Sequence, residues 1–194
     1  MLSLTRPSEA RIRRFLEDQS GLPYSYSDVG ASLGEPPVGY VLDHHRVKLG
    51  EGPLAFDRAC AALRGWEMFR VGWVEVWPPA APLEEGTTVA LLARMPGLWT
   101  LFACRIVAVI DEHGPVESYG FAYGTLPGHP LSGEERFTVR WDRADGDVRY
   151  DLLAISRPSR LAWRIGYPLV RLIQRRFAPR SLRAMTRAVT EEGR

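Results

Sequence analysis

The segment YGFAYGTLPGHPLSGEERF, residues 119–137, gathers the side chains most often used for acid–base chemistry. His129 lies between Gly128 and Pro130, and two adjacent carboxylates, Glu134 and Glu135, begin five residues later. An imidazole titrates near neutral pH and can transfer a proton or bind an anion, with a carboxylate assisting. The segment therefore predicts a catalytic site with His129 as acid or base, helped by Glu134 or Glu135. The alternative is a histidine that only hydrogen-bonds within its own loop.

The residues before this loop are expected to form a strand with two unequal faces. Side chains alternate along a strand, so Tyr119, Phe121 and Tyr123 share one face. The other face carries only glycine and alanine between residues 120 and 124. Such a bare face lets a packed helix or a ligand approach the backbone closely. The aromatic face is predicted to line a pocket.

Glu134 and Glu135 start the following strand, and only one of them can point inward. Glu135 is in phase with the apolar side chains of Phe137, Val139 and Trp141, so we expect it to be the inward residue. A buried carboxylate without a partner is costly. Arg105, which interrupts an apolar run, is the partner that we predict, in a pair that is either structural or lines the pocket.

Other chemistries find less support in the sequence. Asp43 and His45 would share a strand face and His44 would oppose them, but no HxH, HExxH or CxxC spacing is present, so no metal site is predicted. No GxSxG motif occurs, and LGEG at 49–52 is too short for a phosphate-binding loop. We expect no cofactor. Cys60 and Cys104 are predicted to be reduced, buried thiols.

Periodicity and turn residues indicate the elements that carry these side chains. A helix is predicted over 8–18, a strand over 39–49 and a helix over 54–66, followed by strands over 71–77, 87–94, 99–111, 117–125, 134–141 and 148–156. A long amphipathic helix follows, which Gly166 and Pro168 should kink and Pro179 should end before a last helix over 180–190.

This order predicts an α+β fold in which a curved antiparallel sheet of about six to seven strands wraps around a long C-terminal helix. We expect one domain over 1–194, with the helix at 8–18 as an N-terminal extension. A sheet curved around a helix can enclose a cavity. The side chains expected to line it are Trp99, Arg105, Tyr119, Phe121, Tyr123, Glu135, Trp163 and Tyr167.

Bulk composition narrows the functional class. The 194 residues are 45% hydrophobic and 25% charged, as in a folded globular protein, and no apolar run is long enough to span a bilayer. The N-terminus lacks the apolar block of a secretory signal, so we expect a cytoplasmic protein. Arg160, Arg164, Arg171 and Arg175 form one side of the terminal helix, which is either a solvated face or a contact for nucleic acid or an anionic membrane. A net charge of only +2 disfavours nucleic acid.

Several stretches resemble a known family. LGEG at 49–52, CRIVAVIDE at 104–112, GFAYGTLPGHPLSGEERF at 120–137 and SRP at 156–158 are similar to the family called domain of unknown function 1990, with a match that starts near Tyr24. The element order resembles the helix-grip fold of START and birch-pollen-allergen-like proteins. The resemblance implies no reaction and no catalytic residues. We therefore expect a protein that binds a small apolar or amphipathic molecule, with an enzyme using His129 or an interaction module using the arginine-rich helix as alternatives.

Overall fold

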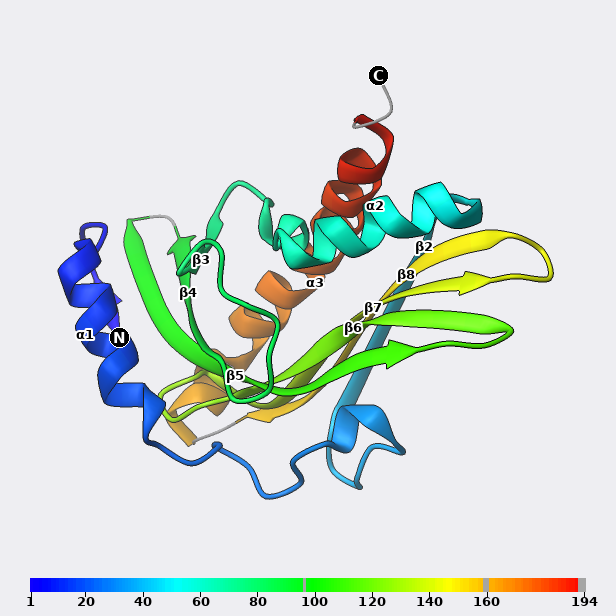
Figure 1. Ribbon diagram of the computed structural model, residues 1–194. Helices are drawn as coiled ribbons and strands as arrows, with labels where there is room; N and C mark the ends of the chain where they lie inside the picture. Colours follow the sequence, from blue (N-terminus) through cyan, green and yellow to red (C-terminus); the bar gives the residue numbers. More distant parts are fainter. Residues whose placement is uncertain (96, 159–160, 192–194) are drawn as a thin grey trace.

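The computed structural model joins the strands of the chain in one curved antiparallel sheet (Figure 1). The structure describes residues 1–95, 97–158 and 161–191, and the side chains of these residues except 158, 161–174 and 191. In this part of the chain the sheet has eight strands: β1 (Leu2–Ser3), β2 (Val41–Glu51), β3 (Val74–Trp77), β4 (Thr88–Met95), β5 (Leu98–Glu112), β6 (Val116–Thr125), β7 (Leu131–Asp142) and β8 (Asp147–Pro158).

The strands lie in the order β2-β8-β7-β6-β5-β4-β3, so β3 to β8 form a meander and β2 crosses to pair with β8. The short β1 pairs with β5 through Leu2 opposite Thr100. Turn residues set most of the strand ends, as the sequence predicts. The clearest case is the β7–β8 hairpin, in which Gly146 takes a positive φ of 80°.

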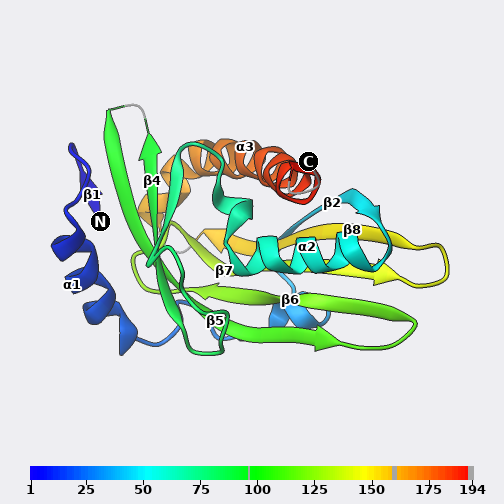
Figure 2. The same cartoon turned by 45° about the horizontal axis from the view of Figure 1, so that its top comes forward.

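Helices α2 (Gly52–Arg64) and α3 (Leu161–Glu191) lie over the same face of the sheet (Figure 2). The sheet curves around α3, so the α+β helix-grip arrangement predicted from the element order is confirmed. The end of α3 is anchored in the core, where Met185 is fully buried and Val189 nearly so. The short 3-10 turn η2 (Glu67–Phe69) follows α2 and places Met68 and Phe69 in the same core.

The prediction that Pro179 ends the long helix is wrong, because α3 runs through residue 179 without interruption. Proline removes one backbone donor, which leaves the carbonyl of the residue four positions earlier without its helical partner. Arg175 and Pro179 are both exposed, so water can bind that carbonyl and the helix continues. No helix among the described residues is both long and apolar enough to cross a bilayer.

Helix α1 (Glu9–Ser20) begins where the sequence predicts, with the Ser8 hydroxyl accepting a hydrogen bond from the backbone N–H of Arg11. It packs beside β4 and β5 at the end of the sheet away from the β7–β8 hairpin (Figure 1). Its apolar side chains Ile12 and Leu16 contact Ala90, Leu92 and Leu101 in a second small core. The chain then crosses below the sheet through the 3-10 turn η1 (Ala31–Leu33) before it enters β2.

Candidate functional site

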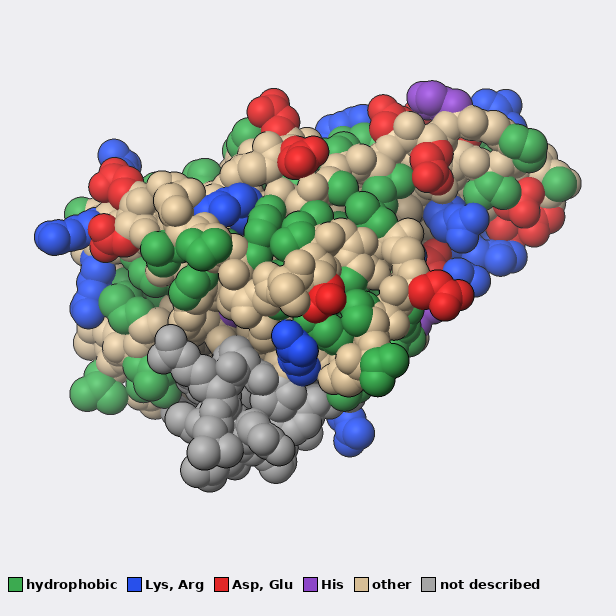
Figure 3. Space-filling view, turned by 90° about the horizontal axis from the view of Figure 1, so that it is seen from below, with side chains coloured by type: hydrophobic (Ala, Val, Ile, Leu, Met, Phe, Trp, Pro, Cys, Tyr) green, Lys and Arg blue, Asp and Glu red, His purple; other side chains and the backbone are tan. Residues whose placement is uncertain are grey.

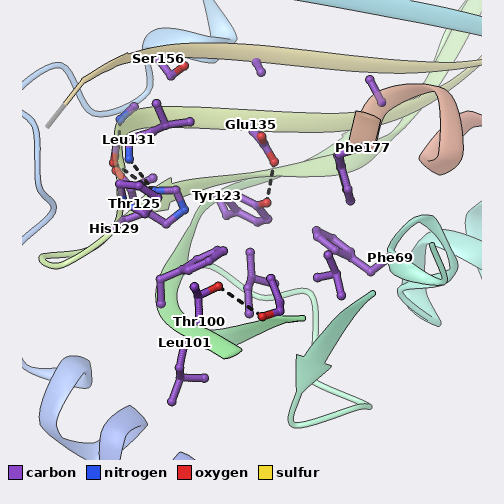
Figure 4. Close-up of a pocket in the computed structure, with 18 of the residues that line it drawn as sticks. Phe69, Thr100, Leu101, Tyr123, Thr125, His129, Leu131, Glu135, Ser156 and Phe177 are labelled. Atoms are coloured by element: carbon purple, nitrogen blue, oxygen red, sulfur yellow. Dashed lines mark hydrogen bonds between the residues drawn. The ribbon is translucent and has the colours of Figure 1, made fainter. Parts of the chain in front are cut away.

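A cavity of about 500 Å³ lies between the sheet and α3 (Figure 4). Its wall comes from the strands β1 to β8, from the loop between β6 and β7, from η2 and from α3, and it is mostly apolar. Polar groups are few and are concentrated on β2, β6 and β7. The residues that line it include Asp43, His45, Phe69, Ala93, Phe102, Tyr123, His129, Glu135, Ala154, Arg175 and Phe177.

The polar centre of the cavity wall is a hydrogen bond between neighbouring strands. Tyr123 on β6 lies opposite Glu135 on β7, and its hydroxyl donates to the Glu135 carboxylate over 2.6 Å. Burial raises the pKa of both groups, and the charge of nearby Asp43 raises the pKa of Glu135 further. The phase argument that placed Tyr123 and Glu135 on the inner face is therefore confirmed, whereas their binding of a ligand stays a prediction.

His129 borders the same cavity but is fixed by its own loop. The backbone N–H of His129 donates to the Leu126 carbonyl over 3.2 Å, and the backbone N–H of Leu131 donates to His129 Nδ1 over 3.0 Å. The ring packs edge-on against Phe102, with 4.5 Å between the ring centroids. Burial lowers the pKa of His129 to about 4, so the imidazole is neutral at pH 7 and Nδ1 already has a donor.

Glu134 points away from the cavity interior, because strand alternation directs its carboxylate to the opposite face of the sheet. There it accepts hydrogen bonds from the Tyr26 hydroxyl at 2.7 Å, the Gly30 backbone N–H at 2.6 Å and the Ser32 backbone N–H at 2.9 Å. The carboxylate is 1% exposed. Glu134 thus holds the segment before β2 against the sheet, and the structure does not bring its carboxylate together with His129.

Arg105 does not pair with Glu135, so that prediction is wrong. The Arg105 guanidinium donates to the backbone carbonyls of Gln19 and Ser20, at 3.2 and 2.7 Å, and so binds the end of α1. Arg105 lies opposite Gly124 in the ladder, on the face that α1 covers. The strand is apolar on both faces, because α1 packs on the side that would otherwise meet water, and alternation alone therefore could not assign Arg105 to a face.

Three further aromatic residues that we expected in the cavity wall lie elsewhere. Trp99 packs against the core under α1. The Tyr119 ring stacks under the guanidinium of Arg64, 4.4 Å from its centroid, and its hydroxyl accepts a hydrogen bond from Arg64 Nε. Phe121 is fully buried, with its ring centroid 4.9 Å from that of Trp66. The side chains of Trp163 and Tyr167 lie outside the described residues.

Two residues that line the cavity were not among those predicted to line it. Asp43 and His45 share a face of β2, as alternation requires, and both border the cavity. Asp43 lies opposite Ala154, which in turn lies opposite Glu135, so the three form one row across β2, β8 and β7. His44 points the other way and bonds Asp151 over 2.7 Å. The shared phase of Asp43 and His45 was visible in the sequence, but the pairing of β2 with β8 was not.

A family model described as domain of unknown function (DUF1990) matches residues 25–184 of the chain. The chain belongs to the DUF1990 family. A UPF0548 protein of Deinococcus radiodurans is 38% identical over 200 residues, which cover 97% of this chain and 98% of that protein. A UPF0548 protein of Dictyostelium discoideum is 30% identical over 208 residues, which cover 97% and 96% of the two chains.

Solved structures resemble this DUF1990 protein at the level of fold. The protein TTHA0849 from Thermus thermophilus superposes with a TM-score of 0.50 at 14% identity, covering 79% of this chain and 100% of the other. Human STARD10 gives a TM-score of 0.49 at 14% identity, covering 97% and 84%. The identity to TTHA0849 is too low to carry a function from one chain to the other, so this likeness shows the fold alone.

The glycines of the stretch that carries the DUF1990 resemblance have a structural cause. A Cβ at position 124 would lie 2.0 Å from the Tyr26 hydroxyl oxygen, and a Cβ at position 120 would lie 2.1 Å from the Phe137 carbonyl oxygen. The bare face of β6 is therefore filled by the protein's own backbone and by the segment that Glu134 holds. We expected a helix or a ligand at that face, and both expectations are wrong for the position of Gly124.

Proposed function

We propose that the protein binds a small apolar or amphipathic molecule in the cavity between the sheet and α3. The observation that carries this proposal is the cavity itself, whose volume of about 500 Å³ falls in the range of small-molecule sites. Most of its wall is apolar, so burying an apolar ligand there would remove hydrocarbon surface from water on both sides. The cytoplasmic location expected from the sequence stays a prediction.

The packing around the cavity supports the interpretation that it is a binding site and not a defect in a loosely packed core. The rings of Phe137 and Tyr123 each contact Phe69 and Phe121 and also contact one another, with centroids 5.3 to 6.3 Å apart, so the neighbouring core is close-packed. Phe177 of α3 contacts Phe69 at 5.3 Å and borders the cavity. Members of this close-packed set thus form one wall of the cavity, and a rigid wall of this kind is typical of a preformed binding site.

The geometry gives less support to an enzyme that uses His129, and it does not test the hypothesis of an interaction module on α3. A general base works best with a pKa near the operating pH, whereas burial lowers the pKa of His129 to about 4. The side chains of Arg160, Arg164 and Arg171 lie outside the described residues, so the arginine-rich face of α3 stays a prediction. On the face seen from below, acidic and basic side chains are interspersed toward both ends (Figure 3), and this part of the surface shows no cluster of one sign.

Cavity occupation tests the proposal directly. Ala93 borders the cavity from β4, so Ala93→Phe places an aromatic ring inside it, whereas Val109→Phe adds the same ring type at a position 39% exposed and outside the cavity wall. We expect the neutral fluorophore N-phenyl-1-naphthylamine to bind the wild type, and its affinity to fall about tenfold or more in Ala93→Phe and little in Val109→Phe. Native mass spectrometry of the purified wild type would also identify a retained molecule.

The control decides between cavity and surface binding. Equal affinity of the wild type and a folded Ala93→Phe variant would place the fluorophore outside the cavity and refute the proposal. Circular dichroism and thermal unfolding establish that both variants are folded before the titrations are compared.

A further inference from the structure

One carboxylate oxygen in the cavity is left without a donor in the described part of the chain. Tyr123 donates to Glu135 Oε2, and Glu135 makes no other hydrogen bond or ion pair with any described residue. Its side chain is half-buried, and the cavity is the space that it borders. A carboxyl oxygen in an apolar wall is costly unless a donor satisfies it. The close-up shows the Glu135 carboxyl group directed toward Tyr123 across the cavity wall (Figure 4).

The surroundings of Glu135 determine which donor would fit. Asp43 borders the cavity on the same row, and only the methyl group of Ala154 stands between the two carboxyl side chains. This small residue leaves space on the sheet surface between two acidic groups. Arg105, the basic residue expected to neutralise Glu135, is engaged with the end of α1 instead.

Among the residues whose side chains the structure describes, the other titratable groups that border the cavity do not reverse this acidic character at Glu135. His129 is held neutral by burial, with Nδ1 accepting from Leu131. His45 lies one row further along β2, opposite Leu152 rather than Ala154. Arg175 borders the cavity from α3 and is exposed, so its charge is largely hydrated. A carboxylate placed beside Ala154 would lie between two carboxyl groups, whereas an ammonium or hydroxyl group there would donate to Glu135.

We propose that the cavity selects amphipathic ligands whose polar end is a hydrogen-bond donor, an amine or a hydroxyl, which binds Glu135 beside Ala154 while the apolar part fills the rest of the cavity. This inference rests on the proposed function, because it names the ligand class of the same site. Both an alcohol and an ammonium group can donate to the Glu135 carboxylate, but only the ammonium adds the attraction of an opposite charge, and a ligand carboxylate would be repelled. A protonated amine should therefore bind more tightly than an alcohol, and an alcohol more tightly than a carboxylate.

A series of ligands with the same ten-carbon chain tests this order. Decylammonium, decanol and decanoate would compete with N-phenyl-1-naphthylamine at pH 7, below their aggregation limits. We expect decylammonium to bind about tenfold more tightly than decanoate. Glu135→Gln keeps a side-chain carbonyl that can accept from Tyr123 but removes the charge, so it should lower the amine-to-carboxylate ratio about threefold or more while changing decanol affinity about twofold or less.

The controls separate the charge at Glu135 from net charge and from loss of the cavity. Glu112→Gln removes one exposed acidic group on the hairpin between β5 and β6, and it should leave the affinity ratio unchanged. If Glu135→Gln is poorly folded, Asp43→Asn provides a second reduction of negative charge on the same row and should lower the ratio in the same direction.

Each outcome has one meaning. Equal affinities of the three ligands, or tighter binding of decanoate, would overturn the donor preference. If the donor preference fails in this way but Ala93→Phe still blocks binding of all three ligands, the proposed function stands and only the donor preference is overturned. Failure of all three ligands and of the fluorophore to bind the wild type would overturn both.

Discussion

Replacement of Glu134 by alanine should strongly weaken the attachment of the segment before β2. The carboxylate accepts three hydrogen bonds, from the Tyr26 hydroxyl and from the backbone N–H groups of Gly30 and Ser32, and it is 1% exposed. A hydrogen bond to a charged group contributes about 1.5 to 3 kcal/mol net, so the loss of three gives a destabilisation of about 4.5 to 9 kcal/mol if the three contributions add. The loss is limited by the free energy of docking the segment, because water would satisfy the two backbone donors once the segment detached.

Urea unfolding and amide hydrogen exchange measure the two parts of this effect. The free energy of unfolding should fall in Glu134→Ala, and the amides of Gly30 and Ser32 should lose their protection before the sheet does. Tyr26→Phe removes one of the three bonds and should cost about 1.5 to 3 kcal/mol in the wild type. In the Glu134→Ala background the same change should cost almost nothing, because its acceptor is already absent.

Glu112→Gln is the matched control for the removal of one acidic group, and it should change stability by less than about 0.5 kcal/mol. The reasoning is refuted if Glu134→Ala unfolds within about 1 kcal/mol of the wild type, or if the amides of Gly30 and Ser32 keep their protection in that variant. Either result would show that apolar packing, and not the carboxylate, holds the segment.

Three other changes test separate contacts. Arg105→Met removes the donor to two carbonyls at the end of α1, so it should cost about 1 to 2 kcal/mol and speed amide exchange in α1 without changing binding in the cavity. Gly133→Ala should lower the free energy of unfolding in urea by more than about 3 kcal/mol, because a Cβ there would lie 2.0 Å from the Ile155 carbonyl oxygen and the residue has a φ of 149°. Gly128→Ala should cost only about 1 kcal/mol, because no atom lies within 4 Å of the Cβ that it would add. His129 has a pKa of about 4 in the fold against 6.5 in the unfolded chain, so its neutral form contributes up to about 3 kcal/mol to the free energy of unfolding. This contribution is fully present above pH 6.5 and is lost as the pH falls through 4. The difference in stability between the wild type and His129→Gln, measured by urea unfolding at several pH values, should follow the same pH dependence.

The sequence predicted the strands well because alternation and turn residues both mark them. Predicted and observed ends differ by three residues at most for the strands from β4 to β8, and the faces of Tyr123 and Glu135 follow from phase alone. The alternation of side chains assigns each residue to a face of the sheet, but it does not show which part of that face borders a cavity. Tyr119 and Phe121 share the face of Tyr123, yet Tyr119 contacts Arg64 of α2, Phe121 lies in the core, and neither borders the cavity.

The contacts between distant segments could not be predicted in the same way. The stretch from Tyr24 to Pro37 has no periodicity, and its role depends on a carboxylate more than 100 residues later. The one local signal was Gly124, whose missing side chain makes room for Tyr26. A bare strand face indicates that something approaches, but the sequence does not say what approaches.

The two adjacent glutamates show how one strand register produces both a structural contact and a candidate binding group. Strand alternation requires that Glu134 and Glu135 face opposite sides, and a one-residue slip of β7 would exchange them. The observed register gives the outward carboxylate three donors and the inward one a single donor. In the slipped register Glu135 would face Gly30 and Ser32, and Glu134 would enter the cavity. Gly133 opposes the slip, because only a residue without a Cβ allows the backbone of β7 to lie so close to Ile155. The donors of the N-terminal segment and this close approach therefore together select which carboxylate remains available to a ligand.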